Sequence, residues 1–176
     1  MTAPMVKRIA VTGPESTGKT RLVRGLASHY NAVWVPEFAR EYVERIGRPY
    51  TYNDILVIVK EHIVRENTLL SKANRFLFCD TDIIVAKIWC DVKYGTCHSW
   101  IRDAIESHRY DLYLLCNIDV PWKGDPLREH PYKRQYIYEL YLAELKNRKL
   151  PFYIISGLGD VRLKHAVQII DKNLKM

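Results

Sequence analysis

The chain has 176 residues, 48% of them hydrophobic, which is enough to bury the core of one α/β domain. It has no apolar run of the roughly 18 residues that a membrane span needs, and residues 1–8 lack the apolar core of a signal peptide. The net charge of +7 comes from basic residues scattered among acidic ones, which argues against a nucleic-acid partner. We therefore expect one cytoplasmic domain over residues 1–176, without a membrane partner.

Short apolar runs alternate with longer amphipathic stretches, and this alternation predicts a parallel sheet with helical crossovers. The expected strands are residues 7–12, 32–35, 75–79, 111–116 and 152–155. The expected helices are residues 19–30, 37–46, 51–74, 81–93, 99–108, 132–148 and a last helix from residue 160. The sequence thus predicts a three-layer α/β/α fold with a parallel five-stranded sheet. Ligands of such sheets bind at the carboxyl ends of the strands.

Residues 13–20, GPESTGKT, match the phosphate-loop pattern G-x-x-x-x-G-K-[ST] and lie between a predicted strand and a predicted helix, as that motif requires. Gly13 and Gly18 allow the backbone N–H groups to face bound phosphates. We expect Lys19 to contact the β- and γ-phosphates of ATP and the Thr20 hydroxyl to ligate Mg²⁺. The other loop residues expected around ATP are Glu15, Ser16 and Thr17.

The segment FLFCDTD at 76–82 is an apolar strand that ends in an aspartate, which is the Walker B arrangement. Behind a phosphate loop, Asp80 is expected to hold Mg²⁺ next to Thr20. Asp82 follows two residues later. It could face the acceptor substrate, or it could simply cap the next helix.

The segment PEFAREY at 36–42 begins where the second predicted strand ends. Glu37 could accept a proton from an attacking hydroxyl, and Arg40, one helical turn on, could bind the acceptor or the transferring phosphoryl group. The alternative is a first-turn glutamate favoured by the helix dipole, with Arg40 in a surface ion pair. The spacing alone leaves both interpretations open.

A loop of three prolines at 117–131 carries Trp122 and Arg128 and leads to Arg134. Mobile arginines that close over the transferring phosphoryl group would stabilise its negative charge, so Arg128 and Arg134 are candidates for a lid. Trp122 could stack on a ring of the ligand. The alternative is an ordinary surface loop. The remaining tryptophans, Trp34, Trp89 and Trp100, are interpreted as core residues.

Several other functions lack their motifs. The segment NIDV at 117–120 lacks the lysine of N-K-x-D, which argues against a guanine-specific GTPase, and neither G-x-S-x-G nor H-E-x-x-H occurs. Cys97 and His98 have no matching second pair for a zinc site. The four cysteines are therefore expected to be reduced and structural.

Taken together, GPESTGKT, PEFAREY, DTD and VPW, with Asp125 and Arg128, resemble the ribosylnicotinamide kinase domain of NadR-type proteins, a small AAA-type family of P-loop kinases. The resemblance runs from about residue 7 to 174. It implies transfer of the γ-phosphoryl group of ATP, with Mg²⁺, to the 5′-hydroxyl of nicotinamide riboside in NAD biosynthesis. Our candidate catalytic residues are Lys19, Glu37, Asp82 and Arg128, and Arg134 is a further candidate for binding ATP. The candidate acceptor-binding residues are Arg40, Tyr42, Asp82 and Trp122.

Two features limit what the resemblance implies. Pro36 replaces an aromatic residue that is common before the glutamate in this family, so the acceptor could be another nucleoside or small metabolite. The chain has no H-x-G-H motif, so neither an adenylyltransferase nor a repressor function is inferred. A P-loop ATPase that acts as a partner-binding switch is the alternative of a different class. Whether Glu37 or Asp82 is the base stays open.

Overall fold

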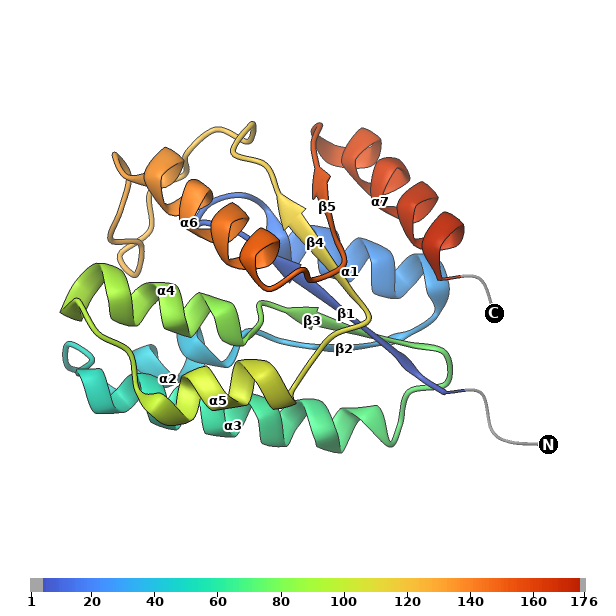
Figure 1. Ribbon diagram of the computed structural model, residues 1–176. Helices are drawn as coiled ribbons and strands as arrows, with labels where there is room; N and C mark the ends of the chain where they lie inside the picture. The colour runs from blue at the N-terminus through green and yellow to red at the C-terminus, as the bar shows by residue number, and fades with distance from the viewer. Residues whose placement is uncertain (1–4, 175–176) are drawn as a thin grey trace.

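The computed structural model describes residues 5–174 and has a parallel sheet between two layers of helices (Figure 1). The strands are β1 (Lys7–Thr12), β2 (Val33–Val35), β3 (Phe76–Asp80), β4 (Leu112–Cys116) and β5 (Phe152–Ile155). The helices are α1 (Lys19–Tyr30), α2 (Phe38–Ile46), α3 (Tyr52–Leu70), α4 (Ile83–Tyr94), α5 (Ser99–Ser107), α6 (Arg134–Asn147) and α7 (Gly159–Asn173). The predicted three-layer α/β/α fold with five parallel strands is confirmed.

The strand order is β2-β3-β1-β4-β5, so β1 lies at the centre of the sheet. Within this order Val11 of β1 pairs with Asp80 of β3, and Thr12 pairs with Leu115 of β4. The chain that leaves β1 therefore emerges beside the carboxyl end of β3. This pairing is what brings residues 13–20 next to Asp80.

The two faces of the sheet are covered by different helices, as Figure 1 shows. Ile9 and Val11 of β1 pack in the core beneath α1 and α7, whereas Ala10 packs in the core beneath α3, α4, α5 and α6. Successive residues of a strand point to opposite faces of the sheet, and here helices cover both faces. This is why β3 and β4 are buried along their whole length.

Some helix boundaries differ from the expected ones for local reasons. The helix expected from residue 81 begins at Ile83, because Thr81 has a left-handed φ of 82° and Asp82 is the extended N-cap residue. The helix expected over 51–74 ends at Leu70, and that expected from 132 begins at Arg134. The capping box predicted at Thr51 is present, with the backbone N–H of Thr51 donating to Asp54 Oδ2 at 2.7 Å.

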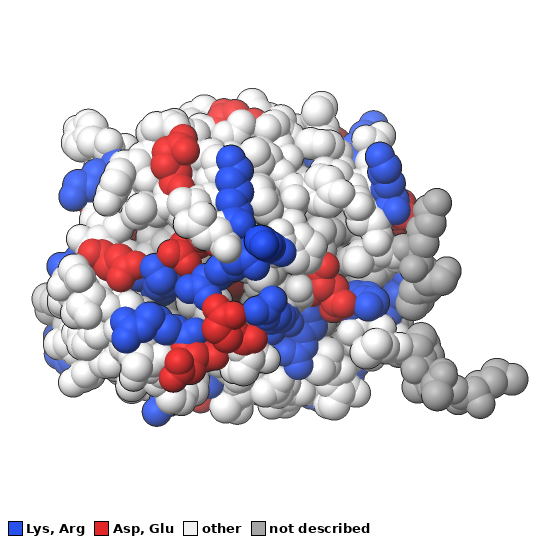
Figure 2. All heavy atoms as spheres, in the orientation of Figure 1, with Lys and Arg blue, Asp and Glu red and all other residues white. Residues whose placement is uncertain are grey.

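The surface carries basic and acidic side chains that lie beside one another on the face shown in Figure 2. Many charged side chains of the described residues form ion pairs, such as Arg65 with Glu41 at 2.7 Å and Arg40 with Asp125 at 3.0 Å. All four cysteines are buried and free, as expected. Within residues 5–174, no helix combines the length and the hydrophobicity needed to cross a bilayer.

Candidate active site

The phosphate loop, residues 13–20, joins β1 to α1 and depends on two glycines. Gly13 has a φ of 130°, and a Cβ atom there would lie 3.0 Å from the carbonyl oxygen of Cys116. Gly18 has a φ of 78° and precedes the first residue of α1. Residues other than glycine rarely adopt these φ angles, so the backbone conformation of the loop requires the two glycines of the motif. The loop thus curls at the amino end of α1, where helix N–H groups favour a bound anion.

Lys19 spans the curled loop. Its ammonium group donates hydrogen bonds of 2.9 Å to the carbonyl oxygens of Gly13 and Pro14. The hydroxyl of Thr17 donates to the same Pro14 carbonyl at 2.8 Å and stabilises the turn. The cation therefore lies against the loop whose backbone N–H groups would face phosphate oxygens.

Thr20 and Asp80 meet at the carboxyl ends of β1 and β3. The Thr20 hydroxyl donates to Asp80 Oδ2 at 2.6 Å, while Asp80 Oδ1 is buried without a hydrogen-bond partner. Burial raises the pKa of Asp80 to about 6, and the charge of Glu37 adds to this effect, whereas Thr20 and Lys19 oppose it. A buried carboxylate oxygen without a partner, beside a hydroxyl, offers the hard oxygen ligands that Mg²⁺ prefers. These residues fit the expected metal ion.

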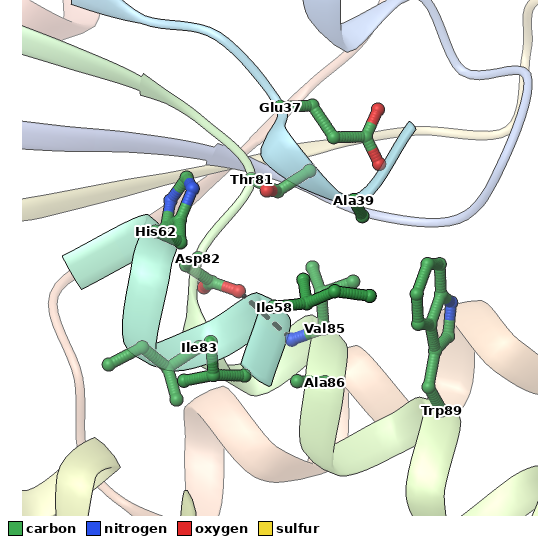
Figure 3. Close-up of a pocket in the computed structure, with 11 residues that line it drawn as sticks. Glu37, Ala39, Ile58, His62, Thr81, Asp82, Ile83, Val85, Ala86 and Trp89 are labelled. Carbon is green, nitrogen blue, oxygen red and sulfur yellow. Dashed lines mark hydrogen bonds between the residues drawn. The ribbon is translucent and has the colours of Figure 1, made fainter. Parts of the chain in front are cut away.

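Asp82 is held inside the protein by the turn that follows β3. Its Oδ1 caps α4 by accepting the Val85 N–H at 3.1 Å, and it also accepts the Thr12 hydroxyl at 3.3 Å. Its Oδ2 has no partner, and the residue lines a cavity of about 30 Å³ together with Glu37 and His62 (Figure 3). Burial raises the pKa of Asp82 to about 6. The capping alternative is therefore observed, and the side chain also borders a cavity.

Glu37 is the N-cap residue of α2 but makes no capping hydrogen bond with its side chain. In Figure 3 its side chain extends away from Asp82 and His62. Glu37 and Trp89 line three adjoining cavities of about 780, 30 and 40 Å³. The largest of these also contains Lys19 and Thr20. The structure therefore places the Glu37 carboxylate and the phosphate loop on the walls of one cavity of a size suited to small-molecule ligands.

The other two candidates in the segment 36–42 have different surroundings. Arg40 lines the large cavity and forms a two-bond ion pair with Asp125, at 3.0 and 3.4 Å. Tyr42 is buried, and its hydroxyl donates to Asp54 Oδ1 at 2.7 Å. Tyr42 is not among the residues that line the three cavities, so the structure gives it a packing role and brings only Arg40 to the site.

Residues 119–133, which we call the lid, extend from β4 over the phosphate loop to α6. The N–H groups of Glu129 and His130 donate to the Glu15 carboxylate at 3.1 and 3.3 Å, and the Lys123 N–H donates to Ser16 Oγ at 2.8 Å. Arg128 also donates to Ser16 Oγ, at 3.3 Å. Two variable positions of the phosphate loop, Glu15 and Ser16, thus bind the lid, which explains why the sequence motif alone did not indicate their role.

The remaining lid candidates form a small cluster. The guanidinium groups of Arg128 and Arg134 lie 5.9 and 5.8 Å from the ring of Trp122. Arg134 also donates to the carbonyl oxygens of Ser16 and Val120, at 3.3 and 2.9 Å, so it anchors the root of the lid. Trp122 contacts these arginines and does not line any of the three cavities.

Sequence reasoning missed three residues at the site. Arg162 of α7 is buried and donates to the carbonyl oxygens of Thr17 and Gly157 and to the Asp119 carboxylate. An arginine on an amphipathic helix gives no signal of such a position. Trp89, interpreted as a core residue, lines all three cavities, and Tyr50 lines the largest of them. Their place depends on how α4 packs beside the α2–α3 loop.

The central β1, the phosphate loop and the Thr20–Asp80 pair define a P-loop domain. The chain belongs to the AAA domain family, whose model matches residues 8–162.

The trifunctional NAD biosynthesis/regulator protein NadR of Escherichia coli K12 is 32% identical to this chain over 172 residues, and that of Salmonella typhimurium LT2 is 29% identical. Each alignment covers 94% of this chain but 42% of the relative, so the chain spans less than half the length of these relatives.

Two solved structures of NadR share the fold. A complex with NR has a TM-score of 0.83 at 23% identity and covers 98% of this chain and 52% of that one. A complex with NAD and AMP-PNP has a TM-score of 0.81 at 23% identity, with 98% and 50% coverage. The resemblance to NadR-type proteins that the motifs indicated is confirmed.

Proposed function

We propose that this chain is an ATP-dependent kinase that transfers the γ-phosphoryl group to the 5′-hydroxyl of nicotinamide riboside and produces nicotinamide mononucleotide. The observation that carries the proposal is the shared cavity of about 780 Å³, which is lined by Lys19 and Thr20 at one part and by the Glu37 carboxylate at another. A kinase needs both a phosphate cradle and a base within reach of one bound acceptor. The similarity to NadR, one structure of which holds NR, supports the choice of acceptor.

The phosphate loop would bind the triphosphate through its backbone N–H groups, and Lys19 would neutralise charge on the β- and γ-phosphates. Thr20 and Asp80 would hold Mg²⁺, which supplies positive charge to the phosphate oxygens. Arg128, which already contacts Ser16, would stabilise the charge that develops on the transferring group. These residues supply electrostatic stabilisation and position the substrate.

Glu37 is our choice of base. Its side chain makes no capping bond and lines the cavity that contains Lys19. As the 5′-oxygen forms its bond to the γ-phosphorus, the bond to the β,γ-bridging oxygen breaks, ADP leaves, and the hydroxyl proton passes to the Glu37 carboxylate. Asp82 is less suited, because it lines the cavity of about 30 Å³ and not the cavity of about 780 Å³ that Lys19 lines, and its Oδ1 is engaged by Thr12 and Val85. Its role would be to shape the inner end of the acceptor cavity.

The test is a matched pair, Glu37→Gln and Asp82→Asn, assayed with Mg-ATP and nicotinamide riboside. We expect Glu37→Gln to lower kcat by about 10²-fold or more with little change in the KM for the riboside. Asp82→Asn should mainly raise that KM. The reverse pattern would make Asp82 the base.

A panel of other nucleosides tests the acceptor, because the choice of nicotinamide riboside rests on the similarity to NadR. If another nucleoside stimulates ADP release and nicotinamide riboside does not, the enzyme is a kinase for that nucleoside. If none does and ATP is still hydrolysed, the chain is better described as an ATPase that acts as a switch.

A further inference from the structure

Glu129 of the lid contacts both halves of the site at once. Its backbone N–H donates to the Glu15 carboxylate of the phosphate loop at 3.1 Å. Its own carboxylate accepts the Tyr50 hydroxyl at 2.6 Å and the Lys93 ammonium at 3.0 Å. A single lid residue therefore joins the loop that would bind ATP to Tyr50, which lines the same large cavity, and to Lys93.

Tyr50 packs against another residue that lines this cavity. Its ring stacks on Trp89 with the centroids 5.6 Å apart and the planes at 20°, and the Lys93 ammonium lies 3.7 Å from the Tyr50 centroid. Trp89 lines all three cavities beside Glu37. A ligand that packs against Trp89 would therefore contact this aromatic pair.

The hydrogen bond between Tyr50 and Glu129 has a charged acceptor. The phenol donates to a carboxylate that also faces a lysine, and hydrogen bonds to charged partners stabilise more than neutral ones. Tyr50 and Glu129 are 79 positions apart in the chain, so the bond ties separate elements together and does not serve a local turn.

We infer that Tyr50 is a positioning residue that holds the lid on the phosphate loop and couples its closure to the acceptor. An acceptor packed on Trp89 fixes the Tyr50 ring, the ring fixes Glu129, and Glu129 holds its N–H on Glu15. Phosphoryl transfer to the acceptor is thereby favoured over transfer to water, because the lid excludes water when it is closed. The role of Tyr50 in holding the lid is independent of the proposed kinase activity, whereas the coupling of lid closure to the acceptor rests on it.

The experiment compares Tyr50→Phe with a matched control, Tyr136→Phe, which alters a tyrosine of α6 that is 57% exposed. Tyr50→Phe keeps the ring on Trp89 and removes only the hydroxyl that binds Glu129. Amide hydrogen exchange of Glu129 and His130 is measured first, with no substrate. We expect about tenfold faster exchange in Tyr50→Phe, the size expected for one hydrogen bond to a charged group, and no change in the control. Unchanged exchange in Tyr50→Phe would overturn the inference.

Steady-state kinetics test the coupling of lid closure to the acceptor. With Mg-ATP and nicotinamide riboside, Tyr50→Phe should lower kcat about tenfold, leave the KM for the riboside within about twofold, and raise the ratio of water-dependent to acceptor-dependent ADP release. In a Glu129→Ala background the same substitution should have no further effect. A Tyr50→Phe enzyme with faster exchange but normal kcat would refute the coupling. A wild-type protein that no nucleoside stimulates would refute the proposed function, while the exchange result still decides the role of Tyr50.

Discussion

Replacement of Glu66 by glutamine should destabilise the protein by about 3 kcal/mol at neutral pH, for reasons that can be worked from its surroundings. Glu66 of α3 is fully buried. Its carboxylate accepts the Tyr110 hydroxyl at 2.5 Å and His108 Nε2 at 2.7 Å, and His62 Nε2 lies 3.0 Å away. Glutamine carries no charge, so the buried polar groups around this position would lose the carboxylate that they surround.

The magnitude follows from the pKa of Glu66. Burial acts to raise this pKa, but the hydrogen bond with His108 and the nearby His62 outweigh burial and hold it at about 2, below the ordinary 4.5. The difference, about 2.5 pH units, corresponds to roughly 3 kcal/mol. Because the folded-state pKa is the lower one, this stability is present above about pH 4.5 and is lost as the pH falls toward about 2.

Urea unfolding at several pH values measures the effect. The wild-type and Glu66→Gln curves should differ most at pH 7 and converge as the pH approaches 2. The control is Glu61→Gln on the same helix, where an exposed pair with Arg65 at 3.3 Å should contribute less than about 0.5 kcal/mol. A Glu66→Gln protein within 0.5 kcal/mol of wild type at pH 7 would show that the carboxylate is not ionised in the folded state, contrary to this reasoning.

The remaining predictions concern the phosphate loop, the metal ion and the lid. Lys19→Ala should lower kcat/KM by about 10²-fold or more while the melting temperature stays close to that of wild type, and normal ATP turnover would remove the basis of the phosphate-loop assignment. Asp80→Asn should raise the Mg²⁺ concentration needed for half-maximal ADP formation, which a magnesium titration at fixed ATP would show, and an unchanged titration would remove Asp80 from the metal site. Arg128→Ala should reduce kcat more than it weakens ATP binding without acceptor, and calorimetry that finds an equal loss of affinity would make Arg128 a ground-state contact.

The sequence alone determined the parts of this protein that depend on neighbouring residues. Alternation of apolar runs with amphipathic stretches predicted five strands and the helices between them, and the pattern at 13–20 predicted a loop whose two glycines have positive φ. The predicted helix start was wrong where the backbone conformation of one residue sets the boundary. Thr81 has a left-handed φ, so α4 begins at Ile83.

Contacts between residues that are far apart in the chain depended on the tertiary structure. The motif predicted Thr20 and Asp80 as partners, but their 2.6 Å bond depends on the pairing of β1 with β3. No pattern indicated that Glu15 would bind the lid, that Arg162 would be buried against the phosphate loop, or that Tyr50 would reach Glu129. Sequence periodicity reports which face of an element is buried, whereas these contacts depend on which elements pack together and at what distance.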